Sequence, residues 1–72
     1  MSENEVISIA NHAAEKAGHI LSKYDKPKAK FNFISQDSTW TVFYDGIIPA
    51  PGNHFMILVK DQTGETQVME GE

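Results

Sequence analysis

The chain has 72 residues, of which 40% are hydrophobic, and ten acidic residues against six lysines give it a formal net charge of −4. This length predicts one small domain, and the four Phe, two Tyr and one Trp exclude a disordered chain. The absence of cysteine excludes disulfides and thiolate metal sites, and an acidic chain with lysine but no arginine is a poor match to nucleic-acid binding.

The first predicted element is an amphipathic helix over residues 2–24. Ser2 and Glu5 have the spacing of a capping box, in which each side chain accepts a hydrogen bond from the other residue's amide. Gly18 lies inside this predicted helix and weakens it, and Pro27 ends it because the residue before a proline avoids helical backbone. Apolar residues recur at helical spacing, which indicates one buried face: Val6, Ile9, Ala10, Ala13, Ala17, Ile20, Leu21 and Tyr24.

Four strands are predicted after the helix, at about residues 30–35, 39–44, 54–60 and 65–70, because these segments alternate apolar and polar residues between turn residues. Short connections favour antiparallel pairing. The predicted fold is therefore α+β, with one helix packed on one face of an antiparallel sheet of about four strands in the order α-β-β-β-β.

Alternation assigns the aromatic residues of the first two strands to faces. Phe31 and Phe33 fall on one face of the first strand, and Trp40, Val42 and Tyr44 fall on one face of the second. Large aromatic residues dominate small cores, so we expect the Trp40 face to lie under the helix.

The last two strands are joined by a turn over Asp61-Gln62-Thr63-Gly64, with the residues that a type I turn prefers at its ends. A bulge at Gly64 changes the register of the fourth strand by one residue. Whether Val68 or Met69 points inward therefore stays open.

The connection between the second and third strands reads Ile-Ile-Pro-Ala-Pro-Gly-Asn over residues 47–53. Its two prolines favour a stiff, extended backbone. We expect an ordered connection across the end of the sheet.

The residues resemble two families of small bacterial domains. The resemblance rests on the helix pattern Ile-Ala-x-x-Ala-Ala-x-x-Ala-Gly from Ile9, on Trp40-Thr41-Val42-Phe43-Tyr44, and on residues 54–60 followed by Asp61-Gln62-Thr63-Gly64-Glu65. These motifs are similar to those of PepSY-like domains and of short nuclear-transport-factor-like immunity proteins, over about residues 7–71. The resemblance implies a domain that binds or inhibits peptidases, or neutralises toxins, by surface contact without catalysis.

Catalytic and metal-binding patterns are missing from the sequence. His12 and His19 are seven residues apart, which is about 10 Å along a helix and too far for one zinc ion unless the helix breaks at Gly18. The acidic residues sit mostly at predicted caps, turns and the tail, and there is no cysteine, nucleophile elbow or glycine-rich phosphate loop. We therefore expect no enzyme, no cofactor and no metal.

The N-terminal residues and the hydropathy pattern bear on localisation. Glu3 and Glu5 lie where a signal peptide carries basic residues, and no run approaches the roughly 20 apolar residues of a membrane span. We expect a cytoplasmic protein without membrane contact, or a periplasmic one if the chain is an excised mature domain.

A single helix can cover only one face of the predicted sheet. The other face then retains large apolar side chains, and an exposed apolar patch marks an interaction surface. The predicted function is a non-catalytic protein-binding module of the inhibitor or immunity type, and the alternative is a structural homodimer formed by sheet-to-sheet packing without another ligand. The predicted contact residues lie on the open face and in the 47–53 loop: Phe43, Asp45, Ile47, Ile48, Met56 and Leu58.

Overall fold

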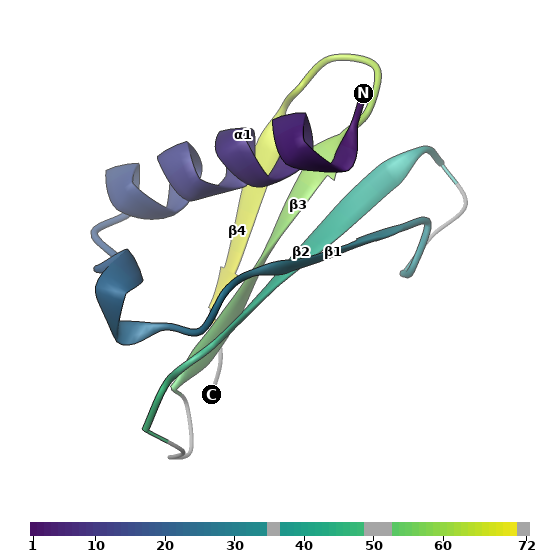
Figure 1. The fold of residues 1–72 in the computed structure, drawn as a ribbon. Helices are drawn as coiled ribbons and strands as arrows, with labels where there is room; N and C mark the ends of the chain where they lie inside the picture. The colour runs from purple at the N-terminus through teal and green to yellow at the C-terminus, as the bar shows by residue number, and fades with distance from the viewer. Residues whose placement is uncertain (35–36, 49–52, 71–72) are drawn as a thin grey trace.

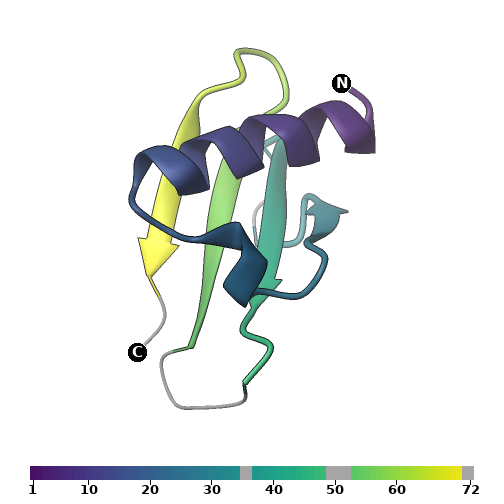
Figure 2. The same ribbon diagram turned by 60° about the vertical axis from the view of Figure 1, so that its left-hand side comes forward.

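The structure, a computed structural model, describes residues 1–34, 37–48 and 53–70. One helix, α1 (Glu3–Lys16), and one 3₁₀ turn, η1 (Leu21–Lys23), precede the strands β1 (Lys28–Phe31), β2 (Thr39–Asp45), β3 (His54–Lys60) and β4 (Thr66–Glu70). The strands form one antiparallel sheet in the order β1-β2-β3-β4, and α1 lies across one side of it (Figures 1 and 2). This arrangement confirms the predicted α+β fold. In the described part of the chain, no helix has the length and apolar character needed to cross a membrane.

The start of α1 is fixed by the predicted capping box. The Glu5 amide donates to Ser2 Oγ and the Ser2 amide donates to Glu5 Oε1, both at 3.2 Å. Hydrogen bonding of the Glu5 carboxylate to the Ser2 amide, and next to the Ser2 side chain, lowers the pKa of Glu5. Val6, Ala10 and Ala14 are the helix residues that become fully buried, so small alanine side chains let α1 approach the sheet closely.

The predicted end of the helix is wrong, because α1 stops at Lys16 and not at residue 24. Gly18 has φ +94°, its amide donates to the Glu15 carbonyl, and the His19 amide donates to the Ala14 carbonyl. This is a Schellman motif, in which glycine adopts the left-handed conformation just past the helix. Gly18 therefore terminates the helix, whereas the sequence pattern placed it in the interior.

The chain after Gly18 packs against the sheet through aromatic rings. His19 stacks on Phe55 with ring centroids 3.8 Å apart, and Tyr24 meets Phe55 edge-on at 4.9 Å. Tyr44 stacks on Phe55 with a centroid distance of 4.5 Å. Ile20, predicted to be buried, is exposed because it follows the break in the helix.

The core lies between α1 and the β2–β3 pair. Tyr44 is buried, its hydroxyl donates to Asn11 Oδ1 at 2.7 Å, and burial raises its pKa to about 12. Trp40 is half-buried against the core, and its Nε1 donates to Asp61 Oδ1 at 2.9 Å. The predicted Trp40, Val42 and Tyr44 face thus lies on the helix side. Five strand residues form the buried sheet side of the core: Val42, Tyr44, Phe55, Ile57 and Val59.

The strand bounds agree with the sequence except in β1. That strand covers Lys28–Phe31, not residues 30–35, because Asn32 has φ +53° and leaves the extended conformation. The predicted 54–60 strand is confirmed, and β2 and β4 differ from their predicted ranges by one residue. Residues 35–36 and 49–52 of the predicted segments lie outside the described residues.

Candidate protein-binding face

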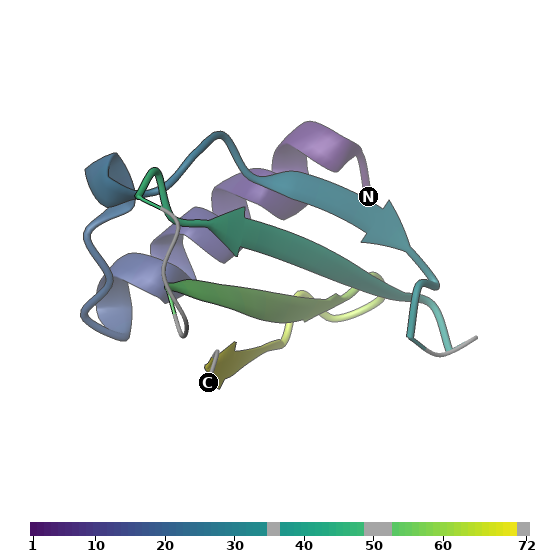
Figure 3. The ribbon, with the colours of Figure 1, turned by 90° about the horizontal axis from the view of Figure 1, so that it is seen from below.

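The side of the sheet opposite α1, which we call the outer face, carries a row of apolar side chains. The register aligns Phe43 of β2, Met56 of β3 and Met69 of β4, with Lys28 of β1 at the end of the row. Side chains that are directly opposite in neighbouring antiparallel strands lie on the same face and touch. Phe43 and Met56 are half-buried and Met69 is 41% exposed. The row is therefore an accessible apolar band across three strands. The strands that carry it are seen from below in Figure 3.

The register of β4 resolves the alternative that the sequence left open. Val68 pairs with Ile57 and packs against the core, whereas Met69 pairs with Met56 on the outer face. Met69 therefore extends the row formed by two of the predicted contact residues, Phe43 and Met56.

The outer face is roofed in part by the chain's own loop after β1. Phe33 meets Phe43 edge-on with a centroid distance of 5.2 Å, and Lys30 Nζ lies 5.0 Å from the Phe33 ring centroid. Phe31 instead contacts Trp40 on the helix side. The prediction that Phe31 and Phe33 share a face is wrong, because the positive φ of Asn32 breaks the alternation. Phe33 thus covers part of the face that the helix leaves open.

The outer face also holds a buried hydroxyl. Thr41 is only 1% exposed, and its Oγ1 has no hydrogen-bond partner among the described residues. It sits between Lys30 and Leu58 in the register, next to Phe43 along β2. The centre of the outer face is therefore covered, and the accessible apolar part lies toward β3 and β4.

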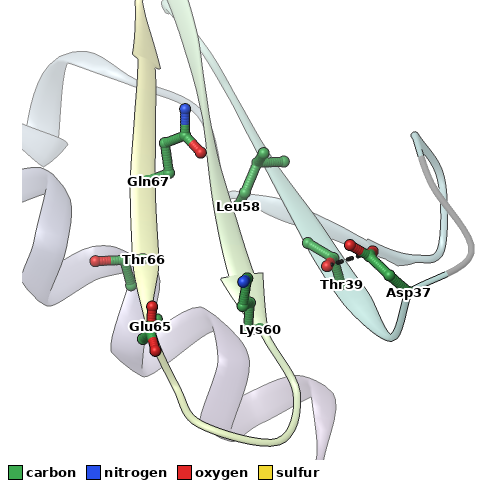
Figure 4. A pocket seen from close by; sticks show the side chains of 7 residues that line it. All are labelled: Asp37, Thr39, Leu58, Lys60, Glu65, Thr66 and Gln67. Atoms are coloured by element: carbon green, nitrogen blue, oxygen red, sulfur yellow. Dashed lines mark hydrogen bonds between the residues drawn. The ribbon is translucent and has the colours of Figure 1, made fainter.

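Leu58 borders a hollow of about 260 Å³ at one end of the outer face (Figure 4). Thr39 Oγ1 donates to Asp37 Oδ1 at 2.7 Å on one side of the hollow, and Lys60 and Glu65 lie at the hairpin end. Gln67 closes the β4 side. The hollow thus places the aliphatic Leu58 among polar and charged side chains, an arrangement suited to one side chain of a partner.

The remaining predicted contact residues lie apart from the apolar row. Asp45 is exposed opposite His54 at the end of β2. Ile47 and Ile48 are 55% and 74% exposed and line a separate hollow of about 360 Å³ beside Lys23. The structure therefore divides the predicted set into an outer-face group and a group at the end of the sheet.

The histidines do not converge. His12 is exposed on α1, His54 is exposed on β3, and His19 is held by Phe55 and by Glu70, whose Oε1 lies 3.1 Å from its Nε2. Among the residues that the structure describes, there is no group of three or more His, Asp or Glu side chains that could hold a metal ion.

No protein-family model, curated protein or solved structure matches the chain. A functional proposal must therefore stand on the geometry of the outer face and on the sequence resemblance, which stays a prediction.

Proposed function

We propose that the chain is a non-catalytic protein-binding module whose main contact surface is the outer face. The observation that carries this proposal is the row of Phe43, Met56 and Met69, which crosses three strands and stays partly accessible although a 72-residue chain has little apolar surface to spare. Methionine side chains are flexible and polarizable, so they adapt to the surface of a partner.

The surroundings of the row suit a protein contact. Aromatic and aliphatic anchors bind best at the centre of an interface, with charged groups at the rim. Lys28 and Lys30 flank the row along β1, and Asp45 lies beyond it. In this proposal Phe43, Met56 and Leu58 are anchors, the lysines orient carboxylates of the partner, and Ile47 and Ile48 offer a second contact at the sheet end.

The inhibitor or immunity role implied by the sequence resemblance is the specific form of this proposal. Such a protein acts by covering a surface of its target, so it needs an accessible face and no reacting groups. The outer face provides such a surface on one side, while α1 closes the other side.

Affinity capture from the lysate of the native host tests the proposal. Met69→Asp is the sharpest variant, because Met69 is already 41% exposed and a charge there disturbs the fold little. We expect proteins retained by the wild type to be lost with Met69→Asp and with Leu58→Asp. Asn4→Asp, on the exposed surface of α1, is the matched control and should retain them. Retention of the same proteins by both outer-face variants contradicts the proposal.

The alternative is a structural homodimer in which two outer faces pack together, since stacked sheets bury such rows between them. Light scattering separates the two functions. A face-to-face dimer must dissociate in Met56→Asp, whereas a monomeric wild-type chain removes this alternative.

A further inference from the structure

The two edges of the sheet are protected differently. Exposed edge strands invite pairing with another chain, and lysines or a break in the strand prevent it. The β1 edge carries Lys28 and Lys30 and ends at the positive φ of Asn32. By contrast, β4 contains no lysine or proline, and four of its five residues are exposed. The unprotected edge is therefore that of β4, which Figure 2 shows at the border of the sheet.

The register shows which backbone groups of β4 are free. The Lys60 amide donates to the Glu65 carbonyl at 2.9 Å and the Lys60 carbonyl accepts from the Gly64 amide at 2.8 Å, so Lys60 and the bulge formed by Gly64 and Glu65 make a hydrogen-bonded pair. Such pairs alternate along an antiparallel ladder, so Gln67 and Met69 direct their backbone groups at β3. Thr66, Val68 and Glu70 direct theirs outward, and no turn or loop of the described chain bonds to them.

A hollow lies on the helix side of the same edge. It has a volume of about 410 Å³, and its lining comes from α1, the β3–β4 turn and β4: Ser8, Ile9, His12, Ala13, Lys16, Gly64 and Thr66. Among these described lining residues, Lys16 carries a positive charge and none is acidic. A carboxylate that enters beside Thr66 finds a complementary surface.

We propose that β4 pairs with β4 of a second copy of this chain, antiparallel and centred on Val68. In this register Thr66 lies opposite Glu70 of the second copy, and Val68 lies opposite Val68. All three outward-facing residues of each strand then gain hydrogen-bonded partners. Within the paired strands, no carboxylate lies directly opposite another.

Charge complementarity selects the second copy as the occupant. Side chains of directly opposite residues share a face, so Glu70 of the second copy is placed beside Thr66 on the helix side. That is the position of the hollow lined by His12 and Lys16. Glu70 is 62% exposed even though it contacts His19 of its own chain, so it remains accessible to a second basic group.

The resulting assembly is one eight-stranded sheet with both helices on one side. Both outer faces then lie on the other side, with Met69 of one copy next to Gln67 of the other. Edge pairing leaves the outer face accessible, so this inference does not depend on the proposed function.

Replacement of the Thr66 amide tests the pairing. Thr66→Pro removes an N–H that points away from β3, a position at which an edge strand accepts proline. Thr66→Val is the matched control, because it keeps the amide and removes only the hydroxyl. In sedimentation equilibrium we expect a wild-type dimer, an equally tight Thr66→Val dimer, and dimerisation weakened about 30-fold in Thr66→Pro, since each dimer loses two backbone hydrogen bonds. A wild-type chain that stays monomeric at millimolar concentration overturns the proposal, and so does a Thr66→Pro dimer as tight as that of Thr66→Val.

A disulfide test remains informative if Thr66→Pro folds poorly. The chain has no cysteine, so Val68→Cys can be oxidised only to the symmetric Cys pair between two copies. Hydrogen-bonded opposite residues have Cα atoms about 5.5 Å apart, a distance that a disulfide spans. Ala29→Cys, half-buried on the β1 edge, is the control. We expect rapid covalent dimerisation of Val68→Cys only, and equal rates for the two variants overturn the proposal.

Discussion

Replacement of Gly18 by alanine gives opposite results for the two possible ends of the helix. In a continuous helix over residues 2–24, alanine in place of an interior glycine stabilises the fold by about 1 kcal/mol. In the structure Gly18 has φ +94°, a conformation that costs an L-residue with a Cβ roughly 1–2 kcal/mol. Apart from its neighbours along the chain, no described residue has an atom within 4 Å of the position that a Cβ would occupy, so this backbone term acts without a steric clash. We therefore expect Gly18→Ala to destabilise the chain.

Thermal unfolding followed by circular dichroism measures this effect. A loss of about 1 kcal/mol corresponds to a decrease of roughly 4–8 °C in Tm for a domain of this size. Gly18→Asn is the matched control, because asparagine tolerates the left-handed conformation better and should cost less than alanine. An increase in stability for Gly18→Ala refutes the Schellman termination and restores the longer helix.

Three further variants test the packing and the titrating groups. Gly46→Ala should cost about 1–3 kcal/mol in urea unfolding, because a Cβ there lies within 2.7 Å of the Asn53 backbone oxygen; an unchanged midpoint contradicts this close approach. Because the pKa of Tyr44 is raised from 10.0 to about 12, the contribution of Tyr44 to stability is complete below pH 10 and decreases as the pH rises toward 12. Tyr44→Phe should therefore lose less stability than the wild type between pH 10 and pH 12, and an identical loss in both proteins contradicts the raised pKa of Tyr44. Hydrogen bonds from Trp40 and from the N-terminal amine lower the pKa of Asp61. The contribution of Asp61 to the free energy of unfolding is therefore present above the usual carboxyl pKa of 3.8 and is lost as the pH falls through the lowered pKa. The fluorescence of the single tryptophan should report this titration in the wild type and not in Asp61→Asn.

The sequence predicted the elements whose signals are local. The capping box located the start of α1, and the alternation in residues 54–60 located β3 with its bounds. Hydrophobic periodicity also placed Val42 and Tyr44 in the core. These signals depend on neighbouring residues alone, so tertiary structure did not alter them.

The errors arose where one residue left the regular conformation. The sequence around Gly18 is compatible both with a glycine inside a helix and with a glycine just past its end. Only the φ angle of Gly18 distinguishes the two. Asn32 interrupts a pattern that continued as Phe-Asn-Phe, and its positive φ moves Phe33 to the opposite face. Asparagine is among the residues that adopt this conformation readily, so it was the one available signal.

The candidate site was predicted in part. The face of Phe43 and Met56 followed from alternation, but the place of Met69 depended on the register of β4, which the sequence left open. Phe33 and Lys30 were missed as parts of the same face because their contacts require the turn at Asn32. Ile47 and Ile48 were grouped with the outer face, although the structure places them beside Lys23.

Methyl spectra of the methionines test the role of the outer face most directly. The chain has three methionines, of which Met56 and Met69 lie on the outer face, whereas the Met1 amine lies 3.2 Å from Asp61 Oδ1 at the β3–β4 hairpin. With ¹³C-methyl methionine and a captured partner, the proposal predicts that the Met56 and Met69 resonances shift on binding while that of Met1 stays in place. Binding that shifts Met1 and leaves Met56 and Met69 unchanged contradicts the proposal.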